Sequence, residues 1–218
     1  VATLKRALRK EIRGRLAQID ESSLSNQSRA VSTIIKKSTW YKSSKKIGCY
    51  LSMNKGELRT DEIVLDALST GKEVYIPFCY NNHHENESLK NQMKMFKLEN
   101  EMIFLNLIYN KWGVREFLEN QIIGLDEGID QGLDLILMPG LGFDHSGRRL
   151  GHGKGYYDKY ISDLKLKFNS ISTEEVKPKM PMLVGLALSE QILPTGSQVP
   201  TSEHDHHLDL LIGPDGPI

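Results

Sequence analysis

The sequence predicts a single α/β domain over residues 1–218, with a mostly parallel sheet between helices in a three-layer α/β/α arrangement. Residues 46–80 read as a strand, a helix and a second strand, an order that implies a parallel pair joined by a right-handed crossover. Leu133–Met138 is an apolar run interrupted only by Asp134, with the length of a strand buried on both faces. No internal repeat or shift in composition marks a domain boundary.

Two helices are predicted at the N-terminal end of the chain. In residues 3–19 apolar side chains recur every three or four positions, which is typical of an amphipathic helix; they are Leu4, Leu8, Ile12, Leu16 and Ile19. The opposite face is basic and carries Lys5, Arg6, Arg9, Lys10 and Arg13. Such a face is by itself most simply a solvated surface. The second helix covers residues 24–37.

The predicted βαβ unit follows these helices. Lys46–Ser52 is its first strand and Lys72–Tyr80 its second. Between them, Thr60 is placed to cap a helix, and Gly71 lies just beyond the end of that helix.

Further strands are predicted at Met93–Leu98, Leu133–Met138, Met182–Leu188 and Leu208–Ile212. Residues 99–105 are apolar but ambiguous between helix and strand. A helix is predicted to begin at Tyr156, because apolar residues recur at helical spacing from there. Residues 81–92 and 169–181 are polar and predicted to be surface loops, so that His83 and His84 are interpreted as solvated side chains.

Composition excludes several classes of partner. Lys+Arg and Asp+Glu number 28 each, and this balance predicts neither a nucleic acid nor a membrane surface as a partner. No apolar stretch approaches the roughly 18 residues that span a bilayer, and no secretory signal is recognisable. Cys49 and Cys79 lie in strand-like runs and are predicted to be free, buried thiols. We expect a cytoplasmic protein, with the mitochondrial matrix left open.

A basic, glycine-rich stretch follows the Leu133–Met138 strand. Six glycines, at positions 140, 142, 147, 151, 153 and 155, are interleaved with Arg148, Arg149, His152 and Lys154. Chain that bends sharply, exposes N–H groups and carries positive charge at a helix N-terminus is suited to phosphate groups. The stretch matches neither a Walker A loop nor a dinucleotide-binding turn. A tight connection between strand and helix therefore remains the alternative interpretation.

Two aspartates are candidates for binding a cation beside this stretch. Asp158 lies in the first turn of the predicted helix, where it either binds a cation that bridges phosphate oxygens or favourably opposes the helix dipole. Asp205 lies in a run with His204, His206 and His207. Neighbours along an extended segment point to opposite sides, which disfavours a tetrahedral zinc site. Mg²⁺ held by carboxylates and phosphate oxygens is the simpler hypothesis.

Four segments together carry a resemblance to a known family. Met138–Asp158 reads MPGLGFDHSGRRLGHGKGYYD and is long enough to be specific, whereas Tyr50–Glu57, Leu4–Arg9 and Val199–Asp205 are weaker alone. With these segments the chain resembles the 5-formyltetrahydrofolate cyclo-ligases, also called methenyltetrahydrofolate synthetases.

The resemblance implies an ATP- and Mg²⁺-dependent cyclisation of 5-formyltetrahydrofolate to 5,10-methenyltetrahydrofolate, with release of ADP and phosphate. The formyl oxygen would attack the γ-phosphate to give an N5-iminium phosphate, and N10 would then close the ring. The implied partners are therefore small molecules, a reduced folate and ATP, with Mg²⁺ as the cofactor. We expect a monomer.

Roles carry over by position. ATP would contact Lys5, Arg9, Arg149, Leu150, Gly151, His152, Gly153, Lys154, Gly155, Tyr156 and Tyr157. The folate would contact Leu51, Glu57, His152, Gly153, Lys154, Gly155 and Tyr156, and Mg²⁺ would be held by Asp158 and Asp205. Lys154 and Arg149 would be catalytic, because phosphoryl transfer asks the protein mainly for positioning and charge neutralisation.

The sequence departs from the family pattern in three places. His152 stands where some relatives have arginine, Phe117 replaces a proline, and one residue is inserted between Met53 and Glu57. Two other classes of function stay open at this point, a sugar-phosphate isomerase or CoA-transferase-like enzyme and a non-catalytic nucleotide- or folate-binding module. The rival enzyme would need neither the basic N-terminal helix nor Mg²⁺.

Overall fold

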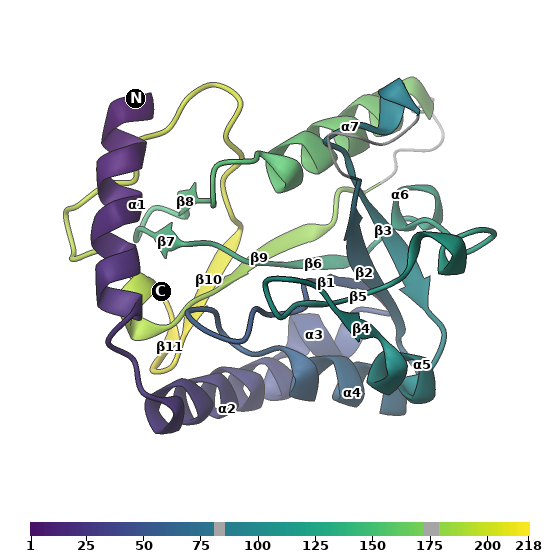
Figure 1. The fold of residues 1–218 in the computed structure, drawn as a ribbon, viewed down its shortest axis with the longest axis horizontal. Coiled ribbons are helices and arrows are strands. Elements are labelled where there is room, and N and C mark those ends of the chain that lie inside the picture. The colour runs from purple at the N-terminus through teal and green to yellow at the C-terminus, as the bar shows by residue number, and fades with distance from the viewer. Residues whose placement is uncertain (81–85, 172–178) are drawn as a thin grey trace.

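The computed structural model describes residues 1–80, 86–171 and 179–218. Its main sheet has seven strands in the order β11, β10, β9, β6, β1, β2, β3 (Figure 1). The strands from β10 to β2 are parallel, and β11 and β3 join the two edges antiparallel, which confirms the predicted mostly parallel sheet. These strands are β1 (Lys46–Cys49), β2 (Glu73–Cys79), β3 (Met93–Leu98), β6 (Leu135–Met138), β9 (Met182–Leu186), β10 (Leu210–Gly213) and β11 (Gly216–Pro217).

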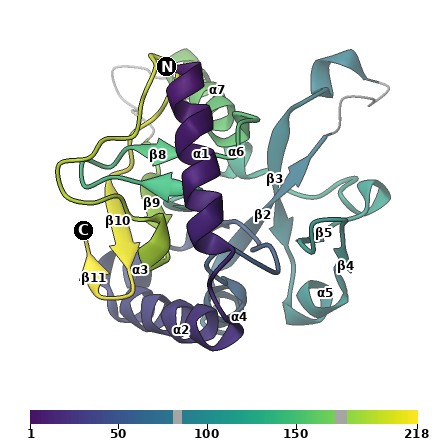
Figure 2. The same cartoon turned by 60° about the vertical axis from the view of Figure 1, so that its left-hand side comes forward.

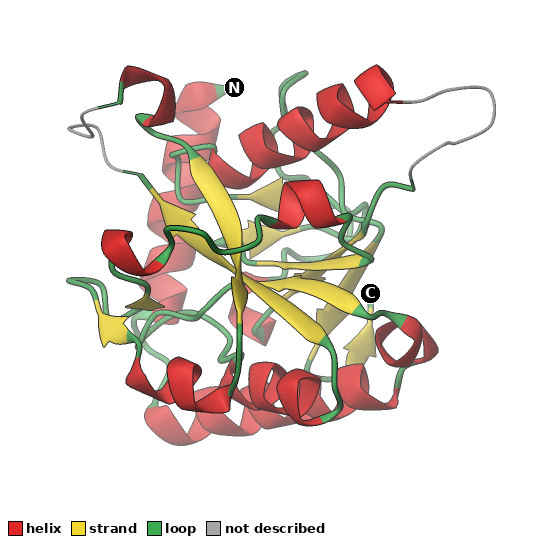
Figure 3. Ribbon diagram, turned by 90° about the vertical axis from the view of Figure 1, so that its right-hand side faces the viewer, coloured by secondary structure: helices red, strands yellow, loops and turns green. Residues whose placement is uncertain are grey.

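Helices cover both faces of this sheet (Figure 3). Alternate residues of β6 belong to two hydrophobic clusters, Leu135 and Leu137 to one and Ile136 and Met138 to the other. The first cluster includes side chains of α2, α3 and α4, and the second includes side chains of α7, so the predicted three layers are confirmed. The helices are α1 (Ala2–Leu16), α2 (Glu21–Lys37), α3 (Thr39–Ser43), α4 (Asp61–Ser69), α5 (Glu101–Asn106), α6 (Gly128–Gln131) and α7 (Tyr156–Ile171).

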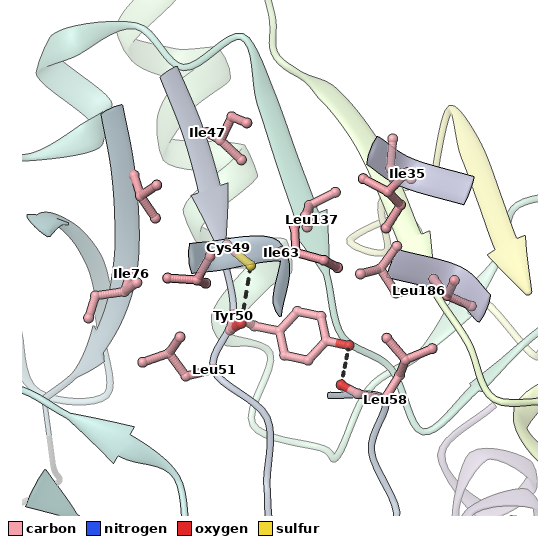
Figure 4. Packing of buried hydrophobic residues seen from close by; sticks show 14 of the residues in the cluster. Ile35, Ile47, Cys49, Tyr50, Leu51, Leu58, Ile63, Ile76, Leu137 and Leu186 are labelled. Carbon is pink, nitrogen blue, oxygen red and sulfur yellow. Dashed lines mark hydrogen bonds between the residues drawn. The ribbon is translucent and has the colours of Figure 1, made fainter. Parts of the chain in front are cut away.

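The first cluster forms the interior between the sheet and the helices below it in Figure 1. In Figure 4, Ile47 of β1 and Leu137 of β6 lie together with Ile35 of α2 and Ile63 of α4. All four side chains are almost completely excluded from solvent. Burial of this kind supplies most of the free energy that holds the layers together, at roughly 25 cal/mol per Å² of apolar surface.

Helix α1 lies beside a short hairpin formed by β7 (Gly142–Phe143) and β8 (Arg149–Leu150) (Figure 2). Ile12 is fully buried in this contact. A Cβ atom at position 142 would overlap Cδ1 of Ile12, so the close approach of helix and hairpin requires Gly142. This packing brings the basic face of α1 to the connection between β6 and α7.

The predicted βαβ unit is confirmed, but one capping detail is wrong. Thr60 does precede α4, yet its hydroxyl donates to the Tyr50 carbonyl at 2.7 Å and caps no helical N–H group. The hydroxyl ties the start of α4 to the end of β1 instead. Gly71 lies just past α4 with a φ of 76°, the left-handed conformation expected after a helix.

The ambiguous residues 99–105 resolve mainly into α5, whose first turn is capped by Asn100 through a bond from the Ile103 amide. Beyond it, β4 (Ile108–Tyr109) and β5 (Arg115–Glu116) pair, and Phe117 is buried just after β5. Short 3₁₀ turns occur at Glu87–Leu89, Glu119–Gln121 and Ser189–Gln191.

Some predictions concern chemistry or segments away from the sheet. Cys49 and Cys79 are both free, as predicted, but Cys79 is exposed at the end of β2 and only Cys49 is buried. None of the described helices is long and apolar enough to cross a membrane. The predictions for His83 and His84, and for residues 172–178, lie outside the described residues.

Candidate active site

The connection from β6 to α7, residues 139–155, starts at the carboxyl end of a central parallel strand, where ligands bind in open α/β sheets. Gly153 and Gly155 are exposed, with φ of 107° and 70°, and they give this turn its shape. Lys154 lies between them, is exposed and makes no ion pair with any described residue. Its ammonium group is therefore available to an anion.

Arg149 lies under this turn, at the end of the β7–β8 hairpin. Its side chain is 4% exposed, and Nη2 donates to Oδ2 of Asp158 at 2.8 Å. Nη1 donates to the Pro139 carbonyl at 3.3 Å, and the guanidinium lies 5.7 Å from the centre of the Tyr157 ring. Nε is buried and has no partner among the described residues. A buried donor without a partner is rare, which makes Arg149 a candidate for binding a ligand oxygen.

A second ion pair joins the two ends of the chain. Lys5 of α1 donates to both carboxylate oxygens of Asp205, at 2.7 and 2.6 Å. The Ser202 hydroxyl also donates to Asp205, at 2.9 Å. Burial alone raises the pKa of Asp205, but the hydrogen bonds from Lys5 and Ser202 outweigh burial and lower the pKa. Asp205 is therefore ionised at neutral pH.

Arg9 and His152 connect α1 with the glycine-rich turn. Nε of Arg9 donates to the Gly151 carbonyl at 2.9 Å. Part of the His152 ring is exposed, but the protein around it and the positive charges of Arg13, Arg149 and Arg9 lower the pKa of His152. A neutral ring at position 152 adds no charge to a site that already gathers several cations.

Glu57 lies in the loop between β1 and α4 and is 5% exposed. Burial raises its pKa to about 7, although the Met53 amide, which donates to Oε2 at 2.8 Å, partly offsets that effect. Tyr157 lies close enough that Glu57 contributes, after burial and Cys79, to raising the pKa of its phenol. The Tyr157 hydroxyl is buried without a partner among the described residues.

A cavity of about 590 Å³ opens beside the same loop. It is bounded by the first half of α2, residues 51–55, the start of α4, Phe104 and the β4–β5 pair, whose Tyr109 and Arg115 face it. Leu51 lines this cavity, whereas Glu57 and residues 149–158 do not. Its volume is in the range of small-molecule sites, about 300–1,000 Å³.

The structure therefore brings most of the predicted site together. Lys5, Arg9 and Asp205 reach the glycine-rich turn and Asp158 from distant parts of the chain. Glu57 lies close enough to Tyr157 to affect its phenol, but the Glu57 carboxylate accepts a hydrogen bond from Met53 of its own loop. Leu51 lines the neighbouring cavity. Glu57 and Leu51 therefore lie apart from the cluster that Lys5, Arg9 and Asp205 form with residues 151–158.

A sequence model described as the 5-formyltetrahydrofolate cyclo-ligase family matches residues 1–214. The chain belongs to the 5-formyltetrahydrofolate cyclo-ligase family. It is 34% identical to the 5-formyltetrahydrofolate cyclo-ligase of Mus musculus, with 100% of this chain and 97% of that protein covered. The Saccharomyces cerevisiae 5-formyltetrahydrofolate cyclo-ligase is 30% identical, with 98% and 97% covered.

Solved structures of the family show the same fold. The 5,10-methenyltetrahydrofolate synthetase of Aquifex aeolicus superposes with a TM-score of 0.69 at 26% identity, over 98% of this chain and 91% of that one. The Mycoplasma pneumoniae 5,10-methenyltetrahydrofolate synthetase has a TM-score of 0.61 at 20% identity, over 96% and 98%.

Two contributors to the site were not predicted from the sequence. Asp144 is 1% exposed and accepts hydrogen bonds from the amides of Ser146, Arg148 and Val199. It thereby joins the β7–β8 hairpin to the segment that carries Asp205. The Asp144-x-x-Gly147 spacing is a turn signal that could have indicated the hairpin, but nothing in the sequence indicates the bond to Val199. The second contributor is the His206 amide, which donates to Oδ1 of Asp158 at 3.1 Å.

The carboxylates of Asp158 and Asp205 fit a hard divalent cation. Both offer oxygen ligands, and consecutive residues, Asp205 and His206, bring the two segments together. No group of three or more His, Cys, Asp or Glu side chains that could hold a metal occurs within residues 1–80, 86–171 and 179–218. Mg²⁺ suits such a pair, because it is commonly held by one or two carboxylates plus water and substrate phosphates.

Proposed function

We propose that this chain is a 5-formyltetrahydrofolate cyclo-ligase that uses ATP and Mg²⁺ to form 5,10-methenyltetrahydrofolate, ADP and phosphate. The observation that carries the proposal is the charged network beside the glycine-rich turn. Lys5, Arg149, Asp158 and Asp205 come from three separate segments and form two ion pairs, which the contact between His206 and Asp158 brings together. These ion pairs bring together cationic side chains that can bind a triphosphate and carboxylates that can bind a metal ion.

ATP would replace the internal partners of these cations. Lys5 and Arg149 would bind phosphate oxygens in place of carboxylate oxygens. This exchange would release Asp158 and Asp205 to hold Mg²⁺. Arg9, Lys154 and the residues from Leu150 to Tyr157 would complete the nucleotide site. Mg²⁺ held by these two aspartates would neutralise negative charge on the phosphates.

The folate would lie on the other side of the turn, against Leu51, Glu57 and Tyr156. The cavity beside Leu51 offers room for part of it, and Arg29 and Lys55 line that cavity without an ion pair to any described residue. These two cations suit the carboxylates at the far end of a folate. Glu57, with a pKa near 7, can accept hydrogen bonds as a carboxylate or donate one as an acid.

The chemistry needs activation of a poor leaving group. A formamide oxygen cannot leave as such, so the formyl oxygen attacks the γ-phosphate, ADP departs and an N5-iminium phosphate forms. N10 then adds to the formyl carbon, its proton is lost, and inorganic phosphate leaves as the ring closes. Arg149 and Lys154 would neutralise charge on the transferred group. No covalent attachment to the enzyme is needed, and the buried Cys49, whose pKa burial raises, is unsuited to one.

The test is a direct assay. The purified protein with 5-formyltetrahydrofolate, ATP and Mg²⁺ is expected to generate the absorbance of the methenyl product, with one ADP and one phosphate formed per ring closed. Omission of ATP or chelation of Mg²⁺ should abolish the signal. Binding of both substrates without turnover would indicate a non-catalytic module, and no binding of folate would contradict the proposal altogether.

Two further properties are part of the same proposal. We infer that the protein acts as a monomer, because the ion pairs Lys5–Asp205 and Arg149–Asp158 form within one chain. We infer a cytoplasmic location, although an Arabidopsis thaliana relative, 30% identical over 98% of this chain, is named as mitochondrial. Imaging of the full-length protein with a C-terminal tag separates the two locations.

A further inference from the structure

The three histidines in the run from Ser202 to His207 have different surroundings. His204 is 86% exposed, and His207 is exposed as well. His206 is partly buried against α7, where its ring contacts Ser162 and Lys165. A ring held on both sides by other residues calls for an explanation that its two exposed neighbours do not.

The hydrogen bonds of the His206 ring can be assigned a direction. Nζ of Lys165 lies 3.0 Å from Nδ1, and because an ammonium group only donates, Nδ1 accepts. The proton of the neutral ring is then on Nε2, which donates to the Ser162 hydroxyl at 2.9 Å. That hydroxyl in turn donates to the Asp158 carbonyl at 2.9 Å.

The main chain of His206 contacts the same aspartate. Its amide donates to Oδ1 of Asp158, while Arg149 occupies Oδ2. One residue therefore holds Asp158 at both ends, through its amide to the carboxylate and through its ring and Ser162 to the carbonyl. Since Asp205 is the preceding residue, this clamp also fixes where Asp205 lies relative to Asp158.

We propose that His206 is a positioning residue, which holds Asp205 beside Asp158 and so prepares the two carboxylates for Mg²⁺ and ATP. The proposal rests on the proposed function, in which those two aspartates hold the metal. Its physical basis is that a segment ordered before binding loses less conformational entropy when the ligand arrives. Hydrogen-bonded partners of metal-binding carboxylates contribute in this way, and their loss costs about 10-fold or more in metal affinity.

The experiment measures binding separately from turnover. Affinity for ATP in the presence of Mg²⁺ is determined by calorimetry without folate, together with the Mg²⁺ concentration that gives half-maximal turnover. In H206A both quantities should worsen by about 10-fold, and S162A, which leaves the ring in place but removes the relay, should worsen them by a smaller factor. The KM for 5-formyltetrahydrofolate should stay within about twofold, because the clamp touches only the metal side.

Matched variants separate positioning from a general structural effect. H204A and H207A alter the two exposed neighbours in the same run and should behave like the unmodified chain in both measurements. H206Q places an amide N–H near the position of Nε2 and should restore most of the affinity. Thermal unfolding of H206A and S162A, without ligands, should lie within a few degrees of the unmodified chain.

Three results would overturn the proposal. The first is an H206A affinity for Mg²⁺ and ATP within about twofold of the unmodified chain. The second is an equal loss in H204A, which would show that the segment and not the clamp matters. The third is an unmodified chain that binds ATP without dependence on Mg²⁺, which would remove the proposed function and this inference together. In the first two cases the proposed function still stands.

Discussion

The glycine-rich turn and the cavity beside Leu51 are held in opposite ways. Around the turn, Arg149 and Lys5 each have a carboxylate partner, Asp158 and Asp205, and the two ion pairs join their segments. Around the cavity, about 590 Å³ is already open; Arg59 and Arg115 of its lining pair with Glu21 and Asp61, but Arg29 and Lys55 face it without ion pairs among the described residues. The first region is filled by its own charges, and the second is hollow.

This difference has a consequence for binding. A ligand at the turn must break ion pairs that already exist, so its net gain is the difference between new and old partners. A ligand in the cavity displaces water and can reach Arg29 and Lys55 without breaking the ion pairs of the lining, Arg59–Glu21 and Arg115–Asp61. Mutations in the charged region should therefore change mainly turnover and metal-dependent binding. Mutations in the hollow region should change mainly the affinity for one substrate.

The largest expected effect is at Lys154. Lys154→Ala should reduce turnover by about 100-fold or more, since it removes a positive charge that stabilises the transferred phosphoryl group. Stability should change by no more than about 0.5 kcal/mol, because the side chain is exposed and has no ion-pair partner among the described residues. Steady-state assays and thermal unfolding measure both. Lys159→Ala, near the start of α7 and also exposed, is the control, and near-native turnover in Lys154→Ala would remove this residue from the mechanism.

Asp158→Asn should lower both activity and stability. It leaves the guanidinium of Arg149, 4% exposed, without a counter-charge, and breaking a buried pair of this kind costs about 3 kcal/mol. Urea unfolding measures the loss. In the double variant Arg149→Met and Asp158→Asn, no charge is left unpaired, so much of the stability should return while activity stays absent. If the single change costs no more than a surface substitution, the turn is not held by this pair.

Glu57, in the loop beside the cavity, can be tested through the pH dependence of stability. Its folded-state pKa of about 7 lies above the ordinary value of 4.5, so the folded protein binds this proton more tightly than the unfolded chain does. The resulting stabilisation is complete below pH 4.5, decreases as pH rises and is lost above pH 7, a total of about 3 kcal/mol.

Glu57→Gln should remove this pH dependence, because its side-chain carbonyl still accepts from the Met53 amide but cannot ionise. Urea unfolding at pH 5 and pH 8 is the measurement, and the variant should gain stability relative to the parent at the higher pH. Identical pH profiles for the two proteins would mean that Glu57 is not strained by burial. The KM for folate should rise in the same variant, whereas that for ATP should not.

The sequence predicted the fold well because local pattern and burial agree there. The run Leu133–Met138 became a central strand, and alternation along it divides the two core layers. The strand was shorter than predicted, Leu135–Met138, since Asp134 lies at its start and accepts bonds from the amides of Lys45 and Lys46. The apolar pattern predicts which residues are buried, but it does not predict the residue at which hydrogen bonding to the neighbouring strands begins.

The site residues were predicted from sequence motifs, which do not show which residues contact one another in the folded chain. The sequence named Lys5 and Asp205 separately, yet only the fold shows that they pair across the chain. The histidines near Asp205 drew attention as possible metal ligands, whereas the contacts of His206 are with Ser162 and Lys165. The cavity could not be foreseen at all, because it is bounded by segments that include α2, α5 and the β4–β5 pair.

The smallest expected effects come from a comparison of Lys5→Ala with Arg29→Ala. Loss of one charge-assisted hydrogen bond, about 1.5 kcal/mol, should raise the KM for ATP roughly 10-fold in Lys5→Ala and leave the KM for folate unchanged. Arg29 is exposed at the edge of the cavity, so its loss should raise the KM for folate only about threefold and leave that for ATP unchanged. Steady-state kinetics with each substrate varied in turn gives all four values. If both variants affect the same substrate, the two regions do not bind different ligands, and the contrast between a filled and a hollow half of the site is not functional.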